Sequence, residues 1–109
     1  MSVEEITEAS EELTEAVNRL LPQLSGSAKL LSSDQVEELL GQDGVYFFTF
    51  RLDGKVLGML TLATFLIPTG RRGIIEDVVV DEGARGHGAG QALVEAALQK
   101  GRDLGLVNI

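Results

Sequence analysis

Cysteine is absent from the sequence, so the chain can form neither disulfides nor cysteine-based zinc sites. Long hydrophobic runs are missing too. The longest apolar stretches have the length of a strand and are interrupted by glycine or threonine, which excludes a membrane span. The first residues are acidic where a signal peptide would be basic. Together these absences predict a soluble, cytoplasmic protein without a metal cofactor.

Basic residues are scarce in the first half of the chain. Residues 1–50 hold ten acids and two bases, whereas residues 51–109 hold seven of each, so the net charge of −8 arises entirely in the first half. This acidic surplus repels phosphates and argues against nucleic-acid binding. We interpret the acidic half as a solvated helix face. The alternative is an acidic patch that attracts a cationic amine.

The length of the chain limits its organisation. Its 109 residues, 44% of them hydrophobic, provide apolar surface for one small core and not for two. We therefore interpret residues 1–109 as one domain. Its first segment, Val3–Ala9, alternates weakly between apolar and polar residues, which predicts a short edge strand.

Two helices are predicted to follow this strand. Ser10 is an N-cap residue in front of an apolar face that recurs at helical spacing, and Pro22 is expected to end or bend that helix near Leu20 or Leu21. Ser32 and Gln35 have the spacing of a capping box at the start of the second helix. Gly41 then predicts where the second helix ends.

The second half predicts an antiparallel meander. Aromatic and β-branched residues predict three strands, over Val45–Leu52, Lys55–Ile67 and Arg72–Asp81. Asp53-Gly54 is a strong hairpin signal between the first two. A glycine-rich loop and an amphipathic helix over 88–104 follow. Leu106–Ile109 begins another strand, which we expect to run parallel to the third strand of the meander.

A glycine-rich turn, Arg85-Gly86-His87-Gly88-Ala89-Gly90, joins the third strand to the last helix. The first N–H groups of a helix are free and lie at the positive end of its dipole, so they attract anions. The glycines can adopt positive φ and allow a phosphate to approach the backbone, while Arg85 adds a charge-assisted donor. These features favour a pyrophosphate ligand.

Two other phosphate-binding motifs do not fit this turn. A Walker A motif requires Gly-Lys-Ser/Thr at the helix start, where this chain has Gly90-Gln91-Ala92. A Rossmann fingerprint requires a parallel βαβ unit early in the fold, whereas a hairpin meander precedes the turn.

The turn and the strand before it resemble the GCN5-related N-acetyltransferase (GNAT) superfamily. The turn matches the signature Arg/Gln-x-x-Gly-x-Gly/Ala, and residues 75–81 look like the fourth strand of members that read Glu-Asp-Val-Val-Val. Such members include glucosamine-6-phosphate acetyltransferases and many small bacterial acetyltransferases. The resemblance covers residues 44–109 well and the preceding part more loosely. It implies an α+β fold with a mixed, mainly antiparallel sheet flanked by helices. In this chain the fold is expected to be truncated at the start of the fifth strand.

The resemblance also implies an activity, the direct transfer of acetyl from acetyl-CoA to a primary amine of a small-molecule or peptide acceptor. Backbone groups of the last strand would pair with the pantetheine arm, an N–H near Val78 would polarise the thioester carbonyl, and turn amides would hold the pyrophosphate. The residues implied in cofactor binding are Val78, Val79, Val80, Arg85, Gly86, His87, Gly88, Ala89, Gly90 and Gln91.

Glu76 and Asp77 are the candidates for the general base. Strand alternation places them on opposite faces, so only one can point into a given site, and we expect Glu76 to be the base. The alternative is that one faces solvent and the other caps a backbone group. His87, the only histidine, occupies a variable position of the motif, so we expect its backbone N–H to matter rather than its ring.

The chain departs from the family at its end. Members continue through a full fifth strand and beyond, and the single tyrosine, Tyr46, does not match their general acid. Three explanations stay open. The chain is a fragment of a longer enzyme, a catalytically incomplete CoA-binding module, or a homodimer paired through the exposed edge of the strand over 72–81.

Overall fold

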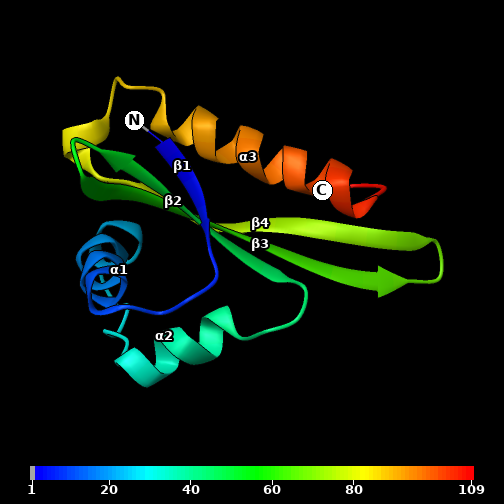
Figure 1. The fold of residues 1–109 in the computed structure, drawn as a ribbon, viewed down its shortest axis with the longest axis horizontal. Coiled ribbons are helices and arrows are strands. Elements are labelled where there is room, and N and C mark those ends of the chain that lie inside the picture. The colour runs from blue at the N-terminus through cyan, green and yellow to red at the C-terminus, as the bar shows by residue number, and fades with distance from the viewer. Residues whose placement is uncertain (1) are drawn as a thin grey trace.

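A computed structural model describes residues 2–109. Its centre is an antiparallel sheet in the order β1-β2-β3-β4, with α3 over one face and α1 and α2 over the other (Figure 1). The elements are β1 (Ser2–Ile6), α1 (Glu11–Leu24), α2 (Ser33–Leu40), β2 (Val45–Leu52), β3 (Lys55–Ile67), β4 (Gly70–Val80), the 3-10 helix η1 (Glu82–Ala84) and α3 (Ala89–Leu104). This arrangement confirms the predicted α+β fold class.

Each face of the sheet has its own apolar core. Leu20 of α1 and Val36 of α2 pack with Met59 on one face, and Leu93 of α3 packs with Leu60 on the other. All five side chains are at most 2% exposed. Burial of an apolar side chain of this size contributes about 1.5–3 kcal/mol, so the helices are held to the sheet chiefly by these contacts.

The predicted helix caps are confirmed. The Oγ of Ser10 accepts a hydrogen bond from the amide of Leu13 at 3.1 Å. Ser32 and Gln35 form the expected reciprocal pair, at 3.2 Å to the serine Oγ and 2.8 Å to the glutamine Oε1. Gly41 follows the last residue of α2. These contacts satisfy amides that the first turn of a helix leaves free.

Pro22 does not end α1, because the helix continues through it to Leu24, so this one of its two predicted effects is wrong. Proline removes the hydrogen bond that its own amide would donate to the carbonyl of Asn18, and its ring crowds that carbonyl. The next turn still closes, since the amide of Ser25 donates to the carbonyl of Leu21 at 3.0 Å. The packing of α1 against the sheet therefore outweighs the loss of one bond in its last turn.

Strand boundaries differ from the prediction at three places. β1 stops at Ile6, before the predicted end at Ala9, because the chain leaves the sheet to reach the N-cap of α1. β4 begins at Gly70, before the predicted Arg72, since it pairs along the whole end of β3. It ends before Asp81, whose side chain turns to cap η1. The sequence pattern does not predict η1.

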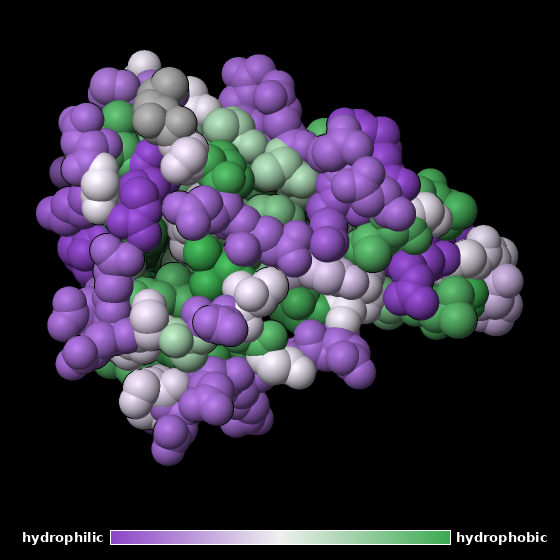
Figure 2. All heavy atoms as spheres, viewed as in Figure 1, coloured by the Kyte–Doolittle hydropathy of each residue, from purple (hydrophilic) through white to green (hydrophobic). Residues whose placement is uncertain are grey.

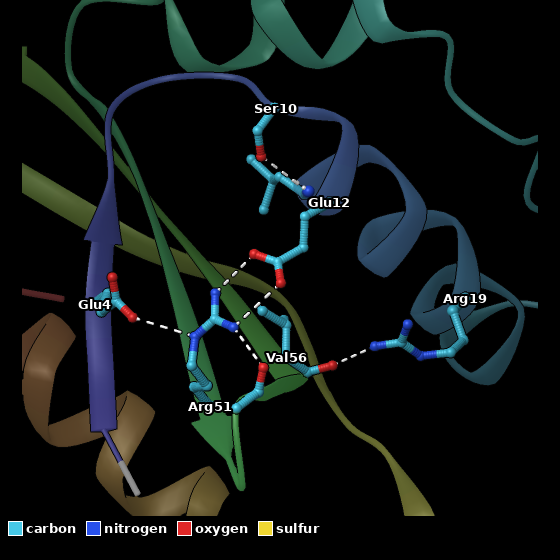
Figure 3. A network of polar contacts seen from close by, with 8 residues as sticks. Glu4, Ser10, Glu12, Arg19, Arg51 and Val56 are labelled. Atoms are coloured by element: carbon cyan, nitrogen blue, oxygen red, sulfur yellow. Dashed lines mark hydrogen bonds and ion pairs between the residues drawn. The ribbon is translucent and has the colours of Figure 1, made fainter.

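Arg51 of β2 holds β1 and α1 together (Figure 3). Its guanidinium contacts both carboxylate oxygens of Glu12, at 2.9 and 3.2 Å, and lies 3.5 Å from the carboxylate of Glu4. It also donates to the carbonyl of Gly54 at 2.7 Å. The hydrogen bond from Arg51, and then its charge, lower the pKa of Glu12. One side chain thus joins the edge strand, the start of α1 and the first hairpin turn.

The hairpin of β3 and β4 projects beyond the helices (Figure 1), and apolar side chains gather on its projecting end (Figure 2). Those exposed in this region are Phe65, Leu66, Ile67, Ile74, Val107 and Ile109. The last residues of the chain run beside the first residues of β4. The amide of Val107 donates to the carbonyl of Arg71, and that of Gly73 to the carbonyl of Asn108, both at 2.9 Å. A single parallel bridge, between Arg72 and Asn108, thus lies where the sequence predicts the start of a further strand.

Candidate functional site

The first four residues of the glycine-rich turn, Arg85 to Gly88, are exposed at the point where η1 leads into α3, whereas Ala89 is buried. Gly86 has a φ of 88° and Gly88 a φ of 70°, so both have left-handed backbone. A Cβ at either position would meet nothing within 4 Å, so backbone conformation and not space is what requires glycine there. Gly90 differs, because it lies in the first turn of α3 without a positive φ.

Most backbone amides of this turn are free. Within residues 2–109, four of them donate no hydrogen bond, those of Gly86, Gly88, Ala89 and Gly90, and neither does the next amide, that of Gln91. The amides of Arg85 and His87 differ, since they donate to the carbonyls of Glu82 at 3.2 Å and Ala84 at 3.3 Å. Gly88 provides no side-chain cap for α3, and the exposed Arg85 lies in the same turn. Free amides at the positive end of a helix suit an anion with several oxygens.

The outer edge of β4 leads into this turn. The amide of Asp81 donates to the carbonyl of Leu57 on β3 at 2.8 Å, so strand alternation turns the backbone groups of Val80 and Val78 away from β3. Val79 alternates with them, and its side chain is buried in the core beside α1. In the described part of the chain, no strand pairs with this section of the edge.

A β-bulge interrupts β4 next to this edge. Met59 pairs with Val79 and Thr61 with Glu76, so β4 uses three residue steps where β3 uses two. The extra residue is accommodated at Asp77, whose φ is 51°. A bulge of this kind bends the strand and changes the face to which the following side chains point.

The bulge overturns the expectation that Glu76 and Asp77 lie on opposite faces. Ile75 packs against the core under α3, so alternation places Glu76 on the side of α1 and α2. Asp77 lines a hollow formed with residues of α1, α2 and the loop between them, which is the same side. Both carboxylates are exposed. The structure therefore brings both predicted base candidates to one face.

The hollow beside Asp77 has a volume of about 370 Å³. Its lining consists of Leu21, Lys29, Leu31, Gln35, Glu38, Leu39, Gln42 and Asp77. The leucines are half-buried and pack against the core, so they form the floor, whereas the polar residues are exposed around it. The sequence does not reveal this hollow, because register and helix packing bring its residues together from distant segments.

A second hollow, of about 500 Å³, lies beside the glycine-rich turn and is lined by Gln23, Asp81, Glu82, Gly83 and Arg85. Asp81 accepts hydrogen bonds there from the Gln23 side chain and the Gly83 amide. These two bonds, in that order of size, lower the pKa of Asp81. Its carboxylate is therefore held in the ionised form.

Residues 2–109 contain neither a cluster of metal ligands nor a helix that could span a membrane. No group of three or more histidine, aspartate or glutamate side chains in this range is placed to hold a metal ion. No helix in the same range is long and apolar enough to cross a membrane.

Comparisons with known proteins agree with this geometry. The model of the acetyltransferase (GNAT) family matches residues 8–109. No curated protein matches the sequence. A similar solved structure is an aminoglycoside acetyltransferase from an uncultured soil metagenomic sample, in complex with sisomicin, at 22% identity and a TM-score of 0.85, covering 98% of this chain and 73% of that one.

Two further solved structures share the fold. One is an acetyltransferase of Trypanosoma brucei, at 25% identity and a TM-score of 0.79, covering 98% of this chain and 78% of that one. The other is glucosamine-6-phosphate N-acetyltransferase of Arabidopsis thaliana, at 21% identity and a TM-score of 0.79, covering 99% of this chain and 80% of that one.

Proposed function

The chain belongs to the acetyltransferase (GNAT) family, and on this basis we propose that it transfers the acetyl group of acetyl-CoA directly to a primary amine. The observation that carries the proposal is the continuity between the open edge of β4 and the free amides of the turn. A pantetheine arm would add to Val78 and Val80 as an extended strand does, and the pyrophosphate would lie on the amides and beside Arg85.

The residues near the bulge suit the transfer itself. The amine nitrogen would form a bond to the acetyl carbon while the carbon–sulfur bond breaks and the CoA sulfur leaves as a thiolate. The outward N–H of Val78 would stabilise the negative charge that develops on the carbonyl oxygen. Glu76 would accept the proton that the amine releases, directly or through water. We further propose that residues 1–109 act as one domain, because both apolar cores share the same sheet.

Calorimetry with acetyl-CoA tests the cofactor site. Arg85→Ala should weaken binding about ten- to 150-fold, since a hydrogen bond to a charged group contributes roughly 1.5–3 kcal/mol. Gly88→Trp should weaken it further, because the new side chain would cover the free amides. Arg102→Ala is the control, since Arg102 lies in the last turn of α3 and bonds Gln99. Normal binding by Gly88→Trp would place the site elsewhere, and no binding at millimolar acetyl-CoA would refute the proposal.

Thiol release across a panel of primary amines tests the transfer. We expect Glu76→Gln to lower kcat while the dissociation constant of acetyl-CoA stays unchanged, because Glu76 would act on the amine and not on the nucleotide. An unchanged kcat would mean that Glu76 is not the base and that a water chain accepts the proton instead.

A second candidate function is a CoA-binding or homodimeric module without transfer. It is favoured by the open section of the β4 edge and by the exposed apolar residues of the projecting hairpin, since unpaired edges invite pairing with another chain. Binding of acetyl-CoA without thiol release would support the module. Sedimentation analysis would test the dimer, which Leu66→Lys should weaken because Leu66 is 70% exposed on that hairpin.

A further inference from the structure

We infer that the hollow lined by Asp77 and by leucines of α1, α2 and the loop between them selects a primary amine carried on an uncharged, apolar body, and that Asp77 binds this amine while Glu76 stays its proposed base. The inference rests on the proposed function, because it assigns the acceptor of that reaction. Asp77 directly precedes Val78, whose N–H would hold the thioester oxygen. An amine in the hollow would therefore lie next to the acetyl group.

The floor of the hollow favours an apolar body. Leu21, Leu31 and Leu39 are half-buried and packed against the core, so each leaves part of its apolar side chain exposed to the hollow. Asn18 fixes Leu31 from both sides, since its Oδ1 accepts from the Leu31 amide at 2.8 Å and its Nδ2 donates to the Leu31 carbonyl at 2.9 Å. An apolar group gains free energy by covering such a floor. A sugar would instead lose water from hydroxyls that the leucines cannot bond.

The rim of the hollow favours a cation over an anion. It carries the carboxylates of Glu38 and Asp77 and one ammonium group, that of Lys29. None of the ion pairs found between residues 2 and 109 involves these three side chains. The rim thus has a net negative charge, which attracts an ammonium group and repels a phosphate. Such a rim disfavours phosphorylated acceptors.

Titration of the ¹⁵N-labelled chain, followed by NMR, tests the inference with three probes: 2-phenylethylamine, glucosamine and glucosamine 6-phosphate. In the presence of CoA, 2-phenylethylamine should shift the amides of Leu31, Gln35 and Asp77. It should bind about tenfold more tightly than glucosamine, because only its apolar body gains by covering the leucines. Glucosamine 6-phosphate should produce no shifts there, because the rim repels its phosphate. Tighter binding of either sugar would overturn the substrate class, and shifts confined to other residues would overturn the site.

A titration with CoA alone separates this inference from the proposed function. If CoA does not shift the amides from Gly86 to Gln91, the proposed cofactor site fails. The titration of the chain with 2-phenylethylamine still decides whether the hollow binds an amine. If CoA binds and 2-phenylethylamine does not, the proposed function stands and the assignment of the acceptor fails.

Matched variants test the role of Asp77. Asp77→Asn keeps the shape, and asparagine tolerates the left-handed backbone, so the fold should persist. We expect it to weaken the binding of 2-phenylethylamine about two- to fivefold, as for a solvent-exposed ion pair. Glu37→Gln is the control, because Glu37 lies on α2 but lines a different hollow, with Thr7 and Ala9. Equal weakening by both variants would show a general charge effect and overturn the role of Asp77.

Discussion

Gln23 in the last turn of α1 donates from its Nε2 to the Oδ1 of Asp81 at 2.7 Å, which ties this helix to the segment in front of the glycine-rich turn. The other carboxylate oxygen accepts from the amide of Gly83 at 2.8 Å. The backbone of Asp81 bonds the carbonyl of Leu57 on β3. Because α1, β3 and η1 all meet at Asp81, the position of the segment that leads into the glycine-rich turn depends on this residue.

Replacement of Asp81 by alanine should lower the free energy of unfolding at pH 7 by about 1 kcal/mol, as for the loss of an N-cap. The donors Gln23 and Gly83 lower the pKa of Asp81 in the folded state. Its stabilising effect is therefore full above the ordinary aspartate pKa of about 3.9 and is lost as the pH falls through the lowered pKa. Urea unfolding should show the difference between wild type and Asp81→Ala shrinking below about pH 4. A constant difference would contradict this account.

Replacement of Gly101 by alanine should loosen the end of the chain without unfolding the protein. A Cβ at Gly101 would lie 2.6 Å from the Cδ1 of Ile109, which must then move. Alanine favours the helix over glycine by about 1 kcal/mol, so global stability should hold. Hydrogen exchange at the amide of Gly73, which donates to Asn108, should become faster. Gln99→Ala on the exposed side of α3 is the control, and slower exchange in Gly101→Ala would refute the prediction.

Replacement of Thr49 by valine should stabilise the protein. Thr49 is 1% exposed, and its Oγ1 has no hydrogen-bond partner among the residues that the structure covers. Valine has nearly the same shape and removes the unpaired hydroxyl, so we expect the free energy of unfolding to rise by about 1 kcal/mol. Urea unfolding measures the change, with Thr61→Val on the half-buried side of β3 as the control. A loss of stability would mean that the hydroxyl of Thr49 is bonded.

Replacements of Asp77 should separate backbone strain from side-chain contacts. Its φ of 51° suits glycine and is costly for a β-branched residue. Asp77→Val should lower the free energy of unfolding by about 1–2 kcal/mol, whereas Asp77→Gly should change it by less. Thermal or urea unfolding shows which of the two variants is less stable. Asp77→Gly would be the less stable one if the side chain and not the backbone determined the stability at the bulge.

The elements that the sequence predicted well depend on close neighbours in the chain. Ser10 caps α1 through Leu13, Gln35 completes the capping box of Ser32, and the chain reverses at Asp53-Gly54. Each of these contacts joins residues at most three positions apart, so a local pattern contains all of the information. The glycine-rich turn was predicted for the same reason.

The features that the sequence did not predict depend on packing between distant segments. Pro22 lies inside α1 because the helix is held by its apolar face, which outweighs one missing bond. Asp77 and Glu76 share a side because the pairing of β3 with β4 shifts by one residue. Gln23 was not singled out, since its partner Asp81 lies on another element and no local signal relates the two.

The sequence by itself determined the order of strands and helices, their caps and the glycine-rich turn, because these follow from local backbone preferences and from the spacing of apolar residues. Only the tertiary structure decided the bulge at Asp77, the hollow beside it and the bond between Gln23 and Asp81. Those features arise where strand register and helix packing bring distant residues into contact.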